Sequence, residues 1–326
     1  MPDNPSLNRF YRRSVRTSFF LVLFLVLIGG VVRSTGAGLG CPDWPKCFGL
    51  WIPPTSITEI PVQFWDHPLS SENGKVIFNP VKTWTEYLNR LLGVIIGFAI
   101  LVQAVLAFFQ TRGLKSRMFS VISLVLVLFQ GWLGSRVVSS DLRPLIISFH
   151  LLVALLIALF LLLALYYSSE RGPVFGPYKE KRYSRLLLVV VSFLLLIQFF
   201  LGTEVRSQVD AMFRQFDYGS REGYVQLLDW KFILHRSLSI LTLLALVLQF
   251  WFLARRLRVE KIWLTLLPLT LVLFLLFSGI ILIYLGFPAF AQPFHLLFGF
   301  SVVCAQFWLC LHYFRPFIGL SHQRTN

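Results

Sequence analysis

The sequence predicts an all-α polytopic membrane protein that consists of two repeated four-helix bundles. The chain is 56% hydrophobic and only 14% charged, and its apolar runs approach the length that a bilayer requires. Polar residues recur where these runs begin: Asn89 and His150 lie 61 residues apart, and His235 and His295 lie 60 residues apart. The second pair follows the first at an offset of 145 to 146 residues, which indicates an internal duplication.

We expect eight membrane spans, at about 17–34, 86–109, 118–138, 145–167, 186–203, 231–253, 262–285 and 293–314. The first run ends at Arg33 and has no small-residue cleavage site after it, so we interpret it as a retained helix rather than a signal peptide. The first four spans belong to an N-terminal half, residues 1–172, which includes a long outer loop at 35–85. The last four belong to a C-terminal half, residues 173–326.

The charge distribution predicts that both termini are cytoplasmic. This orientation places five segments inside the cell: 1–16, 110–117, 168–185, 254–261 and 315–326. They contain 18 of the 30 Lys and Arg residues but only four of the 15 acidic residues, whereas the other 12 basic residues are balanced by 11 acidic ones. This is the positive-inside asymmetry of a protein whose main partner is the lipid bilayer. No basic strip interleaved with aromatic residues lies on a soluble face, so we exclude nucleic-acid binding.

In this orientation the four recurring polar residues all lie near the outer ends of their spans. Polar groups inside membrane segments are costly and usually mark a functional site. Neutral imidazole is the usual axial ligand of b-type haem, and bundles build such sites from facing helices. A single histidine is more often a hydrogen-bonded core residue. Three histidines at matched depth in a duplicated frame, His150, His235 and His295, favour metal ligation instead.

The duplication extends to other residues. The segment GGVVRS at 29–34 aligns with GTEVRS at 202–207, and Gly134 aligns with Gly279 at an offset of 145. Repeats that cross in the same direction are parallel repeats around an axis along the membrane normal. Gly131, Gly134 and Gly279 would let helices or a flat macrocycle approach closely, although ordinary small-residue helix packing explains each glycine equally well.

The four cysteines form two groups. Cys41 and Cys47 flank PDWPK in the first outer loop, on the oxidising side of the membrane, where a disulfide is plausible and two free thiols are the alternative. Cys304 and Cys310 lie inside the last span and are expected to pack as small apolar residues. The sequence has no CxxC-type metal spacing, no glycine-rich phosphate loop and no serine-nucleophile motif.

The motif GGVVRSTGAGLGCPDWPKCFG, the E-x-x-N-R element at 86–90 and the three helix-start histidines together resemble the haem A synthase family. The resemblance covers nearly the whole chain, and the loop STGAGLGCPDWP is its most specific part. It implies a membrane oxidoreductase that oxidises a methyl group of haem O to a formyl group. The product, haem A, serves haem-copper terminal oxidases. The resemblance also implies the bacterial cytoplasmic (inner) membrane, with haem O synthase and terminal oxidase assembly as partners.

In this family the N-terminal half holds the substrate haem and the C-terminal half holds haem b. The resemblance therefore implies that His235 and His295 are the axial ligands of haem b, and that His150 binds the iron of the substrate haem. Glu86 matches the acidic residue to which the family's catalysis is attributed. A carboxylate there could accept protons or stabilise a developing cation on the ring. The alternative is an interfacial acid favoured by the helix dipole.

Asn89 departs from the family, which usually has a histidine at this position. One explanation is an open sixth position that admits oxygen or water, and the other is a degenerate site. We favour the open position because Glu86, Arg90, His150 and the signature loop all remain. Arg90 and Arg236 each follow a ligand position and could pair with haem propionates, although snorkelling to the interface would also explain them.

Three classes of function compete. The leading one is an intramembrane oxidoreductase that modifies haem. The second is a membrane b-type cytochrome that relays electrons without changing its haem. The third is a transporter, which the parallel repeat favours, but the acidic and broken-helix features typical of a transporter midplane are missing. The outer loop is expected to cap the N-terminal haem site.

Overall fold

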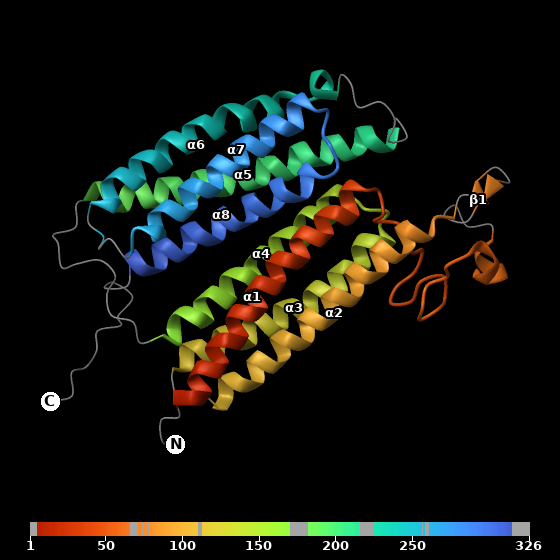
Figure 1. Ribbon diagram of the computed structural model, residues 1–326, viewed down its shortest axis with the longest axis horizontal. Helices are drawn as coiled ribbons and strands as arrows, with labels where there is room; N and C mark the ends of the chain where they lie inside the picture. The colour runs from red at the N-terminus through yellow and green to blue at the C-terminus, as the bar shows by residue number, and fades with distance from the viewer. Residues whose placement is uncertain are drawn as a thin grey trace. The chain divides into compact units, whose positions relative to one another are not determined.

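The computed structural model describes residues 5–65, 71–72, 75–76, 78–109, 113–169, 182–215, 224–255, 257 and 261–314. Eight long helices account for most of these residues (Figure 1). They are α1 (Pro5–Ser34), α2 (Pro80–Phe109), α3 (Leu114–Ser139), α4 (Pro144–Tyr167), α5 (Arg182–Gln215), α6 (Trp230–Ala254), α7 (Trp263–Tyr284) and α8 (Ala291–Tyr313). All eight are long and apolar enough to cross a membrane, which confirms the predicted all-helical fold with eight spans.

The helices extend beyond the predicted spans. Helix α1 begins at Pro5 rather than at about 17, α2 begins at Pro80 rather than at about 86, and α5 ends at Gln215 rather than at about 203. Hydropathy marks only the part of a helix that lipid can accept. Backbone hydrogen bonds are equally available outside that part, so the polar segment EVRSQVDAMFRQ continues α5.

Short elements lie between the helices. The loop between α1 and α2 contains η1 (Ile57–Glu59), η2 (Val62–Phe64) and a hairpin of β1 (Ser71–Glu72) and β2 (Lys75–Val76), and η3 (Tyr224–Leu227) precedes α6. The strands pair antiparallel, with Ser71 opposite Val76 and Glu72 opposite Lys75. We had not predicted this hairpin, although the Asn-Gly dipeptide at 73–74 is a strong sequence signal for one.

Contacts between Cα atoms divide the chain into two compact units. One comprises Met1–Ser168 with Gln292–Phe294, and the other comprises Ser169–Ala291 with His295–Asn326. The boundary that we predicted between residues 172 and 173 lies outside the described residues. In the first unit α1 contacts α2, α2 contacts α3, α3 contacts α4, and α4 contacts α1, so these four helices form a closed bundle (Figure 1).

A buried hydroxyl network joins three helices of the first unit. The hydroxyl of Tyr11 on α1 lies 2.9 Å from Ser116 Oγ and 2.6 Å from Ser120 Oγ, both on α3. Ser116 Oγ also donates to the carbonyl oxygen of Ala164 on α4, at 3.0 Å. Within a membrane bundle, such hydrogen bonds satisfy hydroxyl groups that lipid cannot solvate.

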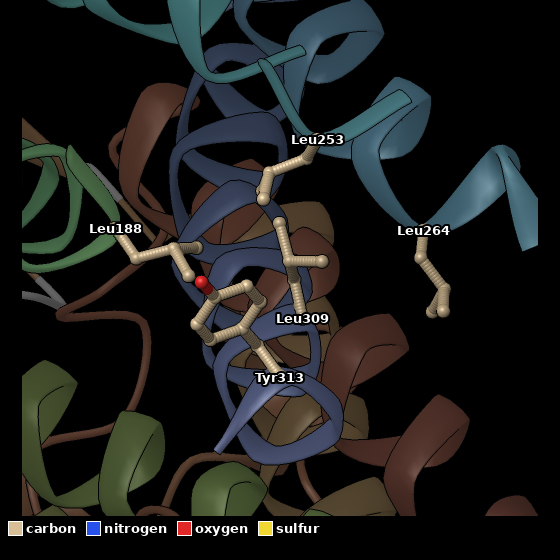
Figure 2. Close-up of a cluster of buried hydrophobic side chains, with 5 residues drawn as sticks. All are labelled: Leu188, Leu253, Leu264, Leu309 and Tyr313. Atoms are coloured by element: carbon tan, nitrogen blue, oxygen red, sulfur yellow. The ribbon is translucent and has the colours of Figure 1, made fainter. Parts of the chain in front are cut away.

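In the second unit all four helices meet at an apolar cluster (Figure 2). It consists of Leu188 on α5, Leu253 on α6, Leu264 on α7, and Leu309 and Tyr313 on α8. Nearby, the amides of Gln249 on α6 and Gln306 on α8 donate to one another at 2.9 Å in both directions. This reciprocal pair is fully buried, so each amide satisfies the other in a region without water.

A second apolar cluster fixes the other end of α5 against α6. Val209 on α5 packs with Leu228, Phe232 and Phe287, and all four side chains are buried. Asp229 caps α6 by accepting the N–H of Lys231 at 2.8 Å, and the Lys231 ammonium lies 2.8 Å from the carboxylate of Glu204 on α5. Packing and capping together fix the first turn of α6, which precedes His235.

Candidate functional site

The loop that follows α1 lies directly against the backbone of α2. A Cβ atom on Gly40 would lie 2.5 Å from the carbonyl oxygen of Lys82, so only glycine fits at this position. The hydroxyl of Thr83 donates to the carbonyl oxygen of Gly40 at 2.9 Å. This close approach explains one glycine of the STGAGLGCPDWP segment and places the cysteine loop at the start of α2.

Glu86 anchors this loop. Its Oε2 accepts the backbone N–H of Cys41 at 2.9 Å, and its Oε1 accepts the Nε–H of Arg90 at 3.1 Å and also contacts Nη2 of Arg90. The Glu86 residue is only 3% exposed. Both carboxylate oxygens are therefore occupied by the chain itself, a role that sequence reasoning missed because it joins residues 45 positions apart.

Arg90 completes the anchor. Its Nη1 donates to the carbonyl oxygen of Asp43 at 2.6 Å and to that of Lys46 at 3.1 Å. Together with its two contacts to Glu86, these bonds leave at most one of the five N–H groups of Arg90 for another ligand. Arg90 thus binds the loop backbone in this state, and pairing with a haem propionate remains a prediction.

The loop has a small core of its own. The structure joins Cys41 and Cys47 in a disulfide, and both residues are fully buried. They pack with Phe48 and Ile60, and with the partly buried side chains of Ile57, Phe64, Phe78 and Tyr87. Since Tyr87 belongs to α2, this core joins the loop to the helix that carries Glu86 and Asn89.

Each predicted ligand position packs against a glycine on the preceding helix. The paired residues are Gly29 with Asn89, Gly134 with His150, Gly202 with His235, and Gly279 with His295. A Cβ atom on these glycines would lie 4.0, 3.5, 3.4 and 3.5 Å, respectively, from the nearest side-chain atom of the partner. The same contact therefore recurs four times, and a side chain larger than alanine on any of these glycines would push the partner away.

His235 on α6 and His295 on α8 face one another in the second unit. Their ring centroids lie 6.5 Å apart and their ring planes are inclined by 70°. Two metal–nitrogen bonds of about 2 Å each, with the distances from nitrogen to ring centre added, span roughly 6 Å. The spacing thus fits one metal ion between the rings. No group of three or more metal-binding side chains exists among the described residues. Two axial imidazoles are a common ligand set for an iron whose other ligands come from a porphyrin macrocycle.

Ser278 contacts the Nδ1 atom of the His295 ring. Its Oγ lies 3.0 Å from the carbonyl oxygen of Leu275 and 2.8 Å from Nδ1 of His295, and the tautomer of His295 determines which of the two accepts the hydroxyl proton. In the tautomer with the proton on Nδ1, the ring donates to Ser278 and Nε2 has a free lone pair for a metal. Sequence reasoning missed Ser278. The signal present in the sequence was that Ser278, a small polar residue in an apolar helix, directly precedes Gly279.

Two glutamines hold the backbone of the other histidines. Gln130 Nε2 on α3 donates to the carbonyl oxygen of His150, and Gln198 Nε2 on α5 donates to that of His235, both at 3.0 Å. Each glutamine lies four residues before the glycine that faces the same histidine, in the segments QGWLG and QFFLG. This repeated Q-x-x-x-G pattern was visible in the sequence, but its meaning depends on the neighbouring helix.

The family described as COX15-CtaA, cytochrome oxidase assembly protein, matches residues 12–307. This range includes some or all of every helix from α1 to α8. The chain belongs to this family of cytochrome oxidase assembly proteins.

Individual proteins are also similar to the chain. A protein of Shewanella oneidensis named Heme A synthase is 30% identical over 203 residues, which are 61% of this chain and 57% of that protein. Proteins of the same name from Rickettsia prowazekii and Shouchella clausii are 30% identical over 153 residues and 28% identical over 131 residues. The match to the Rickettsia protein covers 43% of this chain and 46% of that protein. The match to the Shouchella protein covers 40% of this chain and 36% of that protein. The chain spans about half the length of the curated relatives it matches.

The second predicted arginine has a different environment from the first in this COX15-CtaA member. Arg236 is exposed, and its guanidinium carbon lies 5.7 Å from the centre of the Phe232 ring. It follows His235 directly, so it lies beside the candidate metal site without being tied to a loop as Arg90 is. Its pairing with a propionate also remains a prediction.

Proposed function

We propose that this chain is a haem A synthase, an oxidoreductase of the bacterial cytoplasmic (inner) membrane that oxidises a methyl group of haem O to a formyl group. The observation that carries this proposal is the opposition of His235 and His295 across a space that fits one metal ion. Its support from comparison is that several proteins similar to this chain bear the name Heme A synthase. In this proposal haem O synthase supplies the substrate, and the product goes to terminal oxidase assembly.

In the second unit, His235 and His295 would hold the iron of haem b through Nε2. Ser278 would keep the proton of His295 on Nδ1, and Gly202 and Gly279 would let the two rings lie close to α5 and α7. When bound, such a haem supplies one-electron transfer. This is the chemistry required to carry away the electrons that oxidation of a methyl group releases.

In the first unit, His150 would bind the iron of the substrate haem. Asn89 lies against Gly29 in the place where the other helix pairs present an imidazole, and a carboxamide is a poor ligand for haem iron. The opposite face of the substrate would thus stay open to oxygen or water. A degenerate first site is the alternative, and it would leave a b-type cytochrome that relays electrons.

Glu86 is our candidate catalytic carboxylate. It lies three residues before Asn89, on the first turns of α2, and its side chain is shielded from solvent by the cysteine loop. In this position it could accept protons released from the ring methyl or stabilise positive charge on the ring. We propose that the Cys41–Cys47 disulfide persists on the outer face of the membrane and that the loop caps the first site.

The proposed orientation has both termini in the cytoplasm and treats residues 1–172 and 173–326 as parallel repeats. The positive-inside asymmetry supports the orientation. The recurring glycine contacts, with Gly29 and Gly202 at an offset of 173 and Gly134 and Gly279 at an offset of 145, support the repeat.

Pigment analysis tests the proposal. The protein is produced with a source of haem O, and extracted haems are separated and identified by mass. We expect formyl haem from the wild-type chain and a low-spin bis-histidine spectrum from the purified protein. His235→Ala and His295→Ala should each abolish that spectrum, whereas His312→Ala is the matched control because Nδ1 of His312 lies 2.9 Å from the carbonyl oxygen of Trp308 on its own helix.

Two outcomes would contradict the proposal in different ways. Haem without any formyl product would favour the electron-relaying cytochrome. A bis-histidine spectrum that persists in both alanine variants would overturn the ligand assignment.

A further inference from the structure

The two glutamines that bind the histidine carbonyl groups, Gln130 and Gln198, each have an amide oxygen without a hydrogen bond. A carbonyl oxygen can only accept a hydrogen bond, so the amide nitrogen of Gln130 must face the carbonyl of His150, and that of Gln198 must face the carbonyl of His235. The amide oxygen at the end of each side chain is consequently turned elsewhere. The Oε1 atoms of both glutamines are buried and have no hydrogen-bond partner.

The two histidines have a matching unsatisfied atom. Nδ1 of His150 and Nδ1 of His235 are also buried and without a partner. Each glutamine–histidine pair therefore contains one acceptor without a donor and one ring nitrogen without a partner. Buried polar groups are almost always hydrogen-bonded in native proteins, so two such coincidences, one in each unit, call for an explanation.

The other two ligand positions, His295 and Asn89, show when a polar residue accompanies the facing glycine. The ring of His295 already has a partner for Nδ1, namely Ser278, which directly precedes the facing glycine Gly279. Helix α1 faces Asn89 instead of an imidazole, and its segment LVLIG, residues 25–29, has leucine where α3 and α5 have glutamine. A polar residue thus accompanies the facing glycine wherever that glycine faces an imidazole, and is missing where it does not.

We propose that Gln130 and Gln198 are positioning residues whose amide oxygens accept the Nδ1–H of His150 and His235 when Nε2 of each ring binds haem iron. The inference rests on the proposed function, because it assigns these rings to haem. Binding through Nε2 places the proton on Nδ1 and so creates a donor that needs an acceptor. The terminal amide torsion of glutamine is broad, so rotation can turn Oε1 toward the ring without moving the helix.

This arrangement would tune the metal as well as orient the ring. An acceptor on Nδ1 increases the basicity of the imidazole, which favours the oxidised iron and lowers its midpoint potential. Loss of such a partner typically weakens metal binding by roughly 10- to 100-fold. A residue that only packed against the helix would change protein stability without a matched change in potential.

The test uses the full-length, purified, haem-loaded protein and variants of Gln198. Gln198→Leu should raise the midpoint potential of the His235–His295 haem and weaken its binding by roughly 10- to 100-fold. Gln198→Glu has a stronger acceptor of the same size and should shift the potential in the opposite direction. If the leucine variant does not accumulate, the glutamate variant alone decides, since it must lower the potential.

The matched control is Gln249→Leu, which removes another buried glutamine of the same unit and breaks its amide pair with Gln306. It should reduce stability without shifting the potential. In the first unit, Gln130→Leu should weaken haem O binding by a similar factor and leave the potential of the second haem unchanged.

The outcomes separate this inference from the proposed function. A wild-type bis-histidine spectrum, with the potential unchanged in both Gln198 variants, would overturn the role of the glutamines and leave the haem assignment intact. Potentials that shift in the same direction in the two Gln198 variants would also overturn it. If the wild-type protein showed no bis-histidine spectrum, that result would instead contradict the proposed function.

Discussion

The carboxylate of Glu86 and the backbone N–H of Cys41 are joined by a 2.9 Å hydrogen bond, which ties the disulfide loop to the first turns of α2. The candidate catalytic group is therefore also a structural anchor. A displacement of the loop therefore alters the position of the Glu86 carboxylate, and a substitution that removes the Glu86 acceptor removes a hydrogen bond from the loop.

Replacing Glu86 with glutamine separates these two roles. Glu86→Gln keeps the size and one acceptor oxygen but removes the charge that pairs with Arg90. We expect haem binding to persist while formyl formation falls by roughly 10²- to 10⁴-fold, the range for loss of general acid–base catalysis. Extracted pigments would reveal this, and an alcohol intermediate should accumulate. Full activity in this variant would remove Glu86 from the mechanism.

The four glycine contacts predict a sharp size limit. A Cβ on Gly202 would lie 3.4 Å from Cε1 of His235, an ordinary contact, so Gly202→Ala should retain the bis-histidine spectrum. Gly202→Val adds a branched group and should cost about 1–3 kcal/mol by overpacking, with loss of that spectrum. Gly97→Val is the control, because nothing lies within 4 Å of its Cβ position. An intact spectrum in Gly202→Val would show that the ring does not depend on this contact.

Replacing two different buried glutamines with leucine should change the free energy of unfolding in opposite directions. Both polar atoms of the Gln103 side chain are buried without a partner, so Gln103→Leu should stabilise the protein by about 1–3 kcal/mol. Gln249→Leu leaves Gln306 without its amide partner and should destabilise by a similar amount. Denaturant unfolding in detergent micelles measures both. If both variants were destabilised equally, Gln103 would have to be hydrogen-bonded in the membrane.

Asn89→His tests the open coordination position. If turnover requires a free face on the substrate iron, the new imidazole should slow formyl formation and make the spectrum of the first haem more low-spin. Absorption spectra and pigment analysis of the same preparation give both quantities. Higher activity in this variant would instead identify Asn89 as a tolerated loss of a ligand.

The oxidation state of the outer loop can be read from thiol labelling. Alkylation of the unfolded, non-reduced protein should leave Cys41 and Cys47 unlabelled, whereas Cys304 and Cys310 have free thiols and act as the internal positive control. Peptide mass spectrometry distinguishes the two groups. Labelling of all four cysteines would mean that the loop is held by its apolar core and its hydrogen bonds to α2 without a disulfide.

The sequence was sufficient to locate the helices, and it singled out the candidate ligands, whose role stays a prediction. It did not reveal the residues that surround them. Hydropathy located all eight helices because a bilayer requires long apolar runs, but it placed the end of α5 twelve residues early, at 203 rather than 215. The duplication singled out His235 and His295 by matched spacing, and the structure places their ring centroids 6.5 Å apart with the planes inclined by 70°.

The supporting residues could not be predicted because each depends on a contact between distant segments. Ser278, Gln130 and Gln198 are unremarkable polar residues in apolar helices until the next helix brings a histidine against them. Glu86 and Arg90 lie four residues apart and so share one surface of α2. That this surface faces the cysteine loop follows only from backbone groups of residues 41, 43 and 46.

The cluster of Val209, Leu228, Phe232 and Phe287 has a consequence for how the second unit responds to its membrane. Buried packing at this end fixes the axial register of α5 against α6, and so keeps Gly202 level with His235. Helices adapt to thicker or thinner bilayers by tilting. Because these two cannot slide past one another, a change in lipid thickness should tilt them together and leave the surroundings of the His235 ring unaltered.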